Sequence, residues 1–256
     1  MTDTNSSKNI ILITDLKAND PNLDSYKQYA YSTWRYYAKK YDIQLIILDR
    51  PLTDVEVMRP TWQRWYVYDL LKINDISYNW VAMVDIDTMI RWDAPNIFDV
   101  VPEEMYGAVK DDLSIEWIYN SIQGYKHLFP DVQTLDWTNY VNNGILVLPK
   151  SSGEEFCSRV KDFYHDNINE LRELQHKTLK KGTDQTPVNY LMRRFFKEGV
   201  IFYMPKTFNL THIYKTDAIV DDIYIKCSYI WHFNGIPRDK RSEWMKHTWE
   251  KIKNNY

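Results

Sequence analysis

The sequence lacks the features that mark several protein classes. It contains only two cysteines in 256 residues, Cys157 and Cys227, and their wide separation excludes a disulfide framework and a cysteine-rich zinc site. No apolar run approaches the roughly 20 residues that span a bilayer, and the polar start MTDTNSSK lacks the basic region and apolar core of a signal peptide. We therefore expect a cytoplasmic protein without a transmembrane segment, in which the NLT sequon at Asn209 has no role.

Glycine and net charge are also scarce. The chain has only 7 glycines, and it shows no repeat, low-complexity tract or linker, so we expect a single domain over residues 1–256. Its 32 basic and 35 acidic residues give a formal net charge of −3, which argues against a nucleic-acid surface. The basic RDKR and WMKHTWEKIK segments leave peripheral contact with an anionic membrane open, with a solvated amphipathic helix as the alternative.

What the sequence does contain is an alternation of apolar β-branched runs and helical patterns. Residues 9–16 and 43–49 indicate buried strands, whereas residues 24–40 carry apolar side chains at the helical spacing of three and four. The first hundred residues thus alternate β-α-β-α-β, which predicts an α/β fold with a mostly parallel, Rossmann-like central sheet flanked by helices. Later strands are expected at 105–111, 140–150, 200–205 and 228–233, and helices at 59–73, 153–175, 183–196 and 242–252.

Two aspartates interrupt the apolar run WVAMVDIDTMI. Because side chains alternate along a strand, Asp85 and Asp87 are expected on one face with Cα atoms roughly 6.5–7 Å apart. Two carboxylates at the end of a core strand repel each other, so a positive charge should lie beside them. Strand ends of this kind form the ligand crevice of α/β sheets, where oxygen ligands favour a hard divalent cation. The alternative is an acidic pair that merely ends the strand.

Three further segments carry candidate binding groups. In YIWHFNGIPRDKR, His232 is a candidate third metal ligand, Gly235 permits close backbone approach, and Arg238 can pair with phosphate oxygens. In GTDQTPVNYL, the pair at 184–185 begins a helix, where it either binds a polar ligand or serves as a plain N-cap. In YVNNGILVL, the asparagines either form a turn before a strand or hydrogen-bond a sugar.

Together these motifs resemble the GT-A glycosyltransferases, and in particular the family 8 group of glycogenin-type and lipopolysaccharide galactosyl- and glucosyltransferases. The shared order is D-x-D, then N-x-G before a strand, then D-Q before a helix, then H-x-x-G followed by a cation. The P-x-W-x-R at 60–64 is similar to the P-x-W-x-K of related α-galactosyltransferases. The resemblance spans about residues 9–241, nearly the whole chain, and implies a GT-A fold.

The resemblance also implies roles for individual residues. Asp85, Asp87 and His232 would hold Mn²⁺ or Mg²⁺, and Asp184 and Gln185 would lie beside the reacting carbon. Asp111 matches an acidic residue that contacts the donor sugar, and it completes the implied catalytic set. The residues implied in binding the nucleotide sugar are Thr14, Asp15, Arg64, Asp85, Ile86, Asp111, Asn142, Gly235 and Arg238.

The implied activity is transfer of a hexose, glucose or galactose, from a UDP-linked donor to a glycan, lipid-linked or protein acceptor, with retention of the anomeric configuration. If the enzyme inverts instead, Asp184 or Asp111 would be the general base. Two rivals stay open. A metal-dependent nucleotidyltransferase is disfavoured because NIILITDLKANDPN contains no glycine. A non-catalytic carbohydrate- or nucleotide-sugar-binding protein is disfavoured by the intact acid pair, His232 and the D-Q pair.

Overall fold

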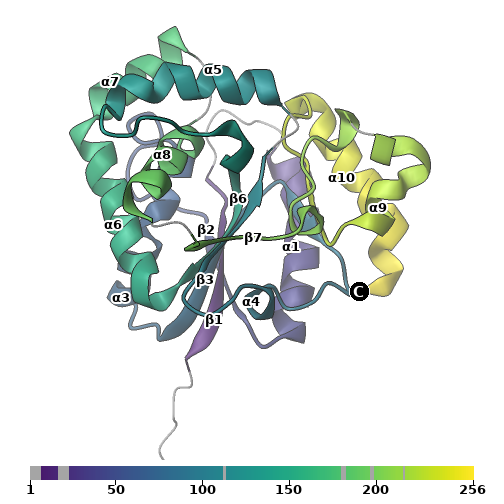
Figure 1. Cartoon of the computed structure of the whole chain (residues 1–256). Helices are drawn as coiled ribbons and strands as arrows, with labels where there is room; N and C mark the ends of the chain where they lie inside the picture. The colour runs from purple at the N-terminus through teal and green to yellow at the C-terminus, as the bar shows by residue number, and fades with distance from the viewer. Residues whose placement is uncertain (1–6, 17–22, 112–113, 180–182, 197–198, 216) are drawn as a thin grey trace, which may run out of the picture.

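The fold is seen in a computed structural model, which describes residues 7–16, 23–111, 114–179, 183–196, 199–215 and 217–256 (Figure 1). A six-stranded sheet forms its centre, in the order β2-β1-β3-β6-β5-β7. Only β6 runs antiparallel to its neighbours, so the mostly parallel sheet expected from the sequence is confirmed. The strands are β1 (Lys8–Thr14), β2 (Gln44–Leu48), β3 (Tyr78–Asp85), β5 (Tyr106–Lys110), β6 (Val141–Pro149) and β7 (Ile201–Tyr203).

Helices cover both faces of this sheet. Because both faces are covered, the middle of β1 is buried without alternation from Ile10 to Ile13. One face packs against α3 (Val67–Ile73), α5 (Ile115–Tyr125), α6 (Lys150–Asp166) and α8 (Gln185–Phe195). The other face packs against α1 (Leu23–Lys40) and α4 (Ile97–Val100), and the apolar cluster on this side extends outward to α9 (Ile223–Cys227) and α10 (Arg238–Ile252).

Helix α1 buries the apolar side chains whose spacing predicted it. Its buried side chains include Tyr26, Ala30, Trp34 and Tyr37, at intervals of three and four. Shorter helical pieces include α2 (Pro60–Gln63), η1 (Arg64–Tyr66), α7 (Ile168–Glu173) and the π-helical turn η4 (Leu174–Thr178). Over the described residues, no helix combines the length and apolar character that crossing a membrane requires.

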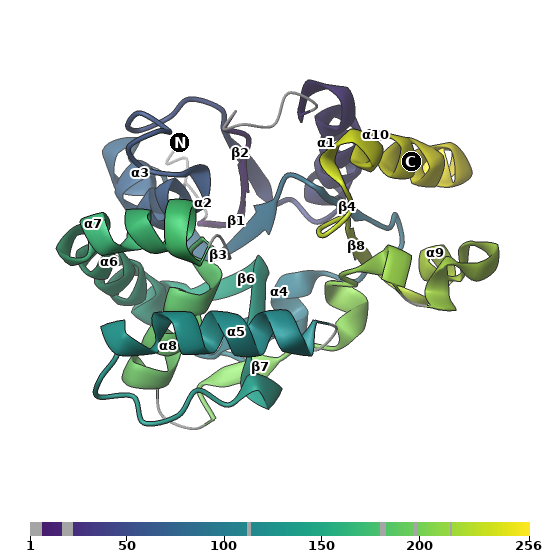
Figure 2. The ribbon, with the colours of Figure 1, turned by 90° about the horizontal axis from the view of Figure 1, so that it is seen from above.

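A second, two-stranded sheet brings the end of the chain back to the D-x-D segment. Strand β4 (Thr88–Ile90) pairs antiparallel with β8 (Ile230–His232), and the register sets Thr88 opposite His232. Figure 2 shows this pair beside α1 and α10. Trp34 donates to the Thr88 hydroxyl at 3.0 Å, and that hydroxyl donates to the carbonyl of Asp85 at 2.6 Å. The acidic segment is thus held between two sheets.

One local expectation was wrong, and at two further positions the structure decides between alternatives that the sequence left open. Asp87 does not continue the strand of Asp85, because β3 ends at Asp85 and a turn leads to β4. The asparagines of NNG do not form a turn before a strand, since they lie inside β6. Asp184 occupies the N-cap position of α8, but its side chain makes no capping hydrogen bond. In each case the polar side chain takes part in the site described next.

Candidate functional site

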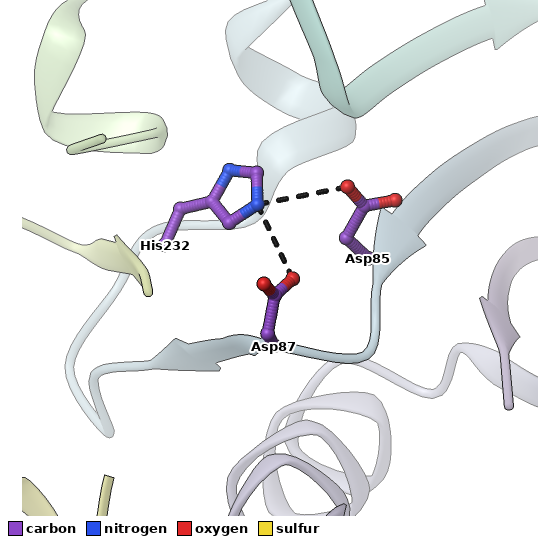
Figure 3. Close-up of side chains that lie close together, drawn as sticks. All are labelled: Asp85, Asp87 and His232. Atoms are coloured by element: carbon purple, nitrogen blue, oxygen red, sulfur yellow. Dashed lines mark ion pairs between the residues drawn. The ribbon is translucent and has the colours of Figure 1, made fainter. Parts of the chain in front are cut away.

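At the end of β3, the neighbouring aspartates Asp85 and Asp87 meet His232, which is distant from them in sequence (Figure 3). Nε2 of His232 lies 3.6 Å from Oδ2 of Asp85 and 3.3 Å from Oδ1 of Asp87. One ligand atom from each residue falls within 4.8 Å of the other two, so the group could hold a metal ion. His232 and Asp87 are buried, whereas the side chain of Asp85 keeps 31% of its surface exposed. The group is therefore formed inside the protein but opens to solvent at Asp85.

Two arginines neutralise the two aspartates from different elements. Arg64, from η1, donates to Oδ1 of Asp85 at 2.7 Å. Arg241, from α10, lies 3.2 Å from Oδ2 of Asp87. Carboxylates buried this closely need compensating charge, and these arginines provide it within the described structure. An incoming cation would share Asp85 with Arg64 and Asp87 with Arg241.

The surroundings shift the pKa of each candidate metal ligand. Burial raises the pKa of Asp85, and the nearby Arg64 only partly offsets this effect. Burial acts in the same direction at Asp87, but Arg241 and His232 outweigh it and hold the pKa of Asp87 well below its usual range. Burial lowers the pKa of His232, yet the carboxylate of Asp87 outweighs burial and raises it. Without a metal, the neighbouring carboxylates thus stabilise the protonated form of His232 more than water stabilises that of a free imidazole.

Arg64 also connects Asp85 to Asp184. Its Nη2 and Nε atoms donate to Oδ2 of Asp184 at 2.6 and 3.2 Å. The same oxygen accepts from the indole of Trp65 at 3.0 Å and the amide of Asn143 at 3.5 Å, and Thr183 donates to the other oxygen at 3.2 Å. Both oxygens of Asp184 thus accept hydrogen bonds. This arrangement lets the carboxylate hold the side chains around it in place, Arg64 in particular.

Asp111 and Gln185 meet on the other side of the site through Asn142. The amide of Asn142 donates to Oδ2 of Asp111 and to Oε1 of Gln185, both at 3.2 Å, and Gln185 donates to Oδ2 of Asp111 at 3.1 Å. Oδ1 of Asp111 is buried and has no hydrogen-bond partner among the described residues. Orphaned buried acceptors are uncommon, and a ligand hydroxyl would satisfy this one.

Asn209 joins the two halves of the site, although no sequence pattern had predicted a role for it. Its side chain is fully buried. Oδ1 of Asn209 lies 3.0 Å from Nδ1 of His232, and its amide donates to Oδ1 of Asn142 at 3.0 Å. The surrounding NLT reads as a glycosylation sequon, which is a surface feature, and no periodicity marks the residue. A chain of hydrogen bonds therefore runs from the metal-ligand group to Asp111.

The remaining residues suggested by the sequence lie around these groups. Thr14, Arg64 and Ile86 line a 310 Å³ cavity with both aspartates of the D-x-D segment and with Arg59, Arg241 and His176. Asp15 lies in a neighbouring 580 Å³ cavity at the ends of β1 and β2, where it accepts from Tyr31 and pairs with Lys27 at 3.4 Å.

Gly235 and Arg238 follow β8. Gly235 is exposed and has a φ of +71°, and a Cβ at this position would lie 2.8 Å from the ring of His212. Glycine is thus required by both the backbone and the space. Arg238 begins α10, but its side chain lies outside the part of the chain that is described.

Comparison with known proteins relates this fold to glycosyltransferases. No family model and no curated protein matches the sequence. Among solved structures, the chain is similar to a glycosyltransferase involved in the glycosylation of the major capsid of PBCV-1, with a TM-score of 0.60 and 13% identity over 94% of this chain and 99% of that one. It is also similar to the bifunctional glycosyltransferase WbbM, with a TM-score of 0.58 and 14% identity over 100% of this chain. The match spans 53% of WbbM. The GT-A type of fold expected from the sequence is confirmed.

Proposed function

We propose that this chain is a metal-dependent glycosyltransferase that transfers a hexose, glucose or galactose, from a UDP-linked donor to a glycan, lipid-linked or protein acceptor. The observation that carries the proposal is the convergence of Asp85, Asp87 and His232, with their ligand atoms within 4.8 Å of one another, beside a 310 Å³ cavity. The fold shared with two glycosyltransferases supports it. The domain would work as one unit over residues 1–256.

The two carboxylates and the imidazole form a mixed oxygen and nitrogen donor set that fits Mn²⁺, with Mg²⁺ as the alternative. When bound, such an ion stabilises negative charge on a departing diphosphate. Arg241 lies beside Asp87, within reach of the same cavity. We assign diphosphate contacts to Gly235 and Arg238, and contacts with the nucleoside to Thr14, Asp15 and Ile86.

Asp111, Asn142 and Gln185 would bind the donor sugar. The free Oδ1 of Asp111 can accept a hydrogen bond from a sugar hydroxyl, while its Oδ2 is held by the two amides. Gln185 places a neutral amide at this position. A neutral amide can stabilise developing positive charge on the sugar through its carbonyl oxygen, but it cannot take a proton at neutral pH.

The set of groups around the donor sugar favours retention of the anomeric configuration over its inversion. An inverting reaction needs a general base with a free acceptor oxygen beside the incoming hydroxyl. Asp184 does not fit that role, because both of its oxygens accept hydrogen bonds and Oδ2 lies against the Arg64 guanidinium. We therefore assign Asp184 to positioning Arg64, and we leave contacts with the reacting sugar to Asp111 and Gln185.

The test is hydrolysis and transfer from a panel of nucleotide sugars with Mn²⁺. The wild-type protein should release UDP from a UDP-hexose, and D85N and D87N should each lose this activity. NMR of the product anomer then decides between retention and inversion. Tight binding of a UDP-hexose without turnover, with or without candidate acceptors, would instead identify a non-catalytic binding protein. Activity that is independent of metal and unchanged in D85N and D87N would contradict the proposal.

A further inference from the structure

We infer that Asn209 is a positioning residue that presents His232 to the metal through Nε2, and that Gly144 provides the space for the ring. This inference rests on the proposed metal-dependent function. It concerns Asn209, which lies outside the shared motifs, and Gly144, the glycine of N-x-G, to which no role was given. The hydrogen bonds that carry it run from the backbone of β6 to the imidazole.

The direction is set at Asn142. The backbone N–H of Gly144 donates to Oδ1 of Asn142 at 2.9 Å, and a backbone N–H cannot accept. The amide nitrogen of Asn142 points the other way, toward Oδ2 of Asp111 at 3.2 Å. A carboxylate accepts but does not donate. Asn142 is thus oriented at both ends of its amide.

The orientation of the Asn142 side chain determines that of Asn209. Because Oδ1 of Asn142 is an acceptor, Asn209 must direct its NH₂ group to it, at 3.0 Å. Oδ1 of Asn209 then faces Nδ1 of His232 at 3.0 Å. Nδ1 of the imidazole must carry the proton, so a neutral His232 keeps its lone pair on Nε2. That atom is the one that faces both aspartates, at 3.6 and 3.3 Å. Partners of this kind fix the tautomer and ring orientation of metal-binding histidines.

The position of the ring depends on Gly144. A Cβ built on Gly144 would lie 2.2 Å from Cε1 and 2.7 Å from Nδ1 of His232. Both residues are in buried strands, so neither backbone can easily retreat. Any other residue at position 144 would displace the imidazole. The missing side chain at position 144 therefore leaves the space that the imidazole of His232 occupies.

The experiment measures binding of Mn²⁺ alone by EPR, which also detects coupling between bound Mn²⁺ and a directly coordinated nitrogen. Wild type should bind Mn²⁺ with nitrogen coupling. N209L removes both hydrogen bonds at similar volume and should weaken Mn²⁺ binding by about 10- to 100-fold, with loss of the nitrogen signal. N209D keeps an acceptor for Nδ1 and should keep the signal. G144A should lose the nitrogen signal even though Asn209 is intact.

The matched control is N189L. Asn189 is equally buried, but its side chain bonds only to backbone groups of Val141 and Gln185. It should retain Mn²⁺ affinity and nitrogen coupling. If N209L behaves as wild type, or if N189L loses as much as N209L, the positioning role is wrong while the metal site stands. If wild type binds no Mn²⁺, or D85N and D87N bind it equally well, the proposed metal site fails and this inference falls with it.

Discussion

Arg64 offers the sharpest test of how the site is held together. One guanidinium, whose side chain is 3% exposed, bridges Asp184, also 3% exposed, and Asp85, which is 31% exposed. Replacing it with Met keeps the apolar stem but leaves two carboxylates without this partner. Removing one member of a buried ion pair costs about 3–5 kcal/mol. Most of this cost should come from Asp184, because solvent screens the more exposed Asp85.

For a chain of this size, 1 kcal/mol corresponds to about 2–4 °C in melting temperature. R64M should therefore melt roughly 6–20 °C below wild type in metal-free buffer, as measured by differential scanning calorimetry. The melting temperature of R64M/D184N should fall by less than the sum of the decreases in the two single variants, because the double variant no longer contains a buried Asp184 carboxylate without its cation. R159M is the control, since Arg159 forms an exposed i,i+4 pair with Glu155 and should shift melting little. A melting temperature for R64M within 2 °C of wild type would refute the bridging role.

The remaining predictions concern the sugar side, the support of the D-x-D segment and the core. D111N should lower kcat/KM for a UDP-hexose by about 10- to 100-fold, the worth of one charged hydrogen bond, with Mn²⁺ affinity retained in an EPR titration. W34F should destabilise the fold by about 1–2 kcal/mol in urea unfolding, because the Thr88 hydroxyl loses its donor. A thiol reagent should label exposed Cys227 quickly and buried Cys157 only after unfolding, because burial also raises the pKa of the Cys157 thiol; equal rates would contradict the packing of α6.

The parts of the molecule that could be predicted are those in which local pattern and final structure agree. The β1 strand is apolar throughout because both sheet faces are covered, and α1 buries one stripe, so periodicity located both elements to within a residue or two. His232 and the two aspartates were linked by motif order, and the β4–β8 pairing supplies the physical reason for their meeting.

The positions that the sequence left open or did not mark are polar residues whose partners are remote in sequence. Asn142 and Asn143 look like turn residues, yet they lie inside β6 because Asp111, Gln185 and Asp184 satisfy their amides. Asp184 looks like an N-cap, but Arg64 lies 120 positions away in sequence and binds its carboxylate. Local secondary-structure propensity depends on nearby residues in the sequence, so it cannot predict partners of this kind. Asn209 was missed for the same reason.

The charge balance of the site links metal binding to donor binding. Two guanidiniums, Arg64 and Arg241, face three carboxylates, Asp85, Asp87 and Asp184. These groups carry one net negative charge when ionised, and buried Asp111 adds another at the far end of the hydrogen-bond chain. A divalent cation at Asp85, Asp87 and His232 would offset this excess in a largely buried setting, where charge is poorly screened. The loaded site would then receive an anionic diphosphate more readily than the metal-free site, so the cation and the donor should each strengthen the binding of the other.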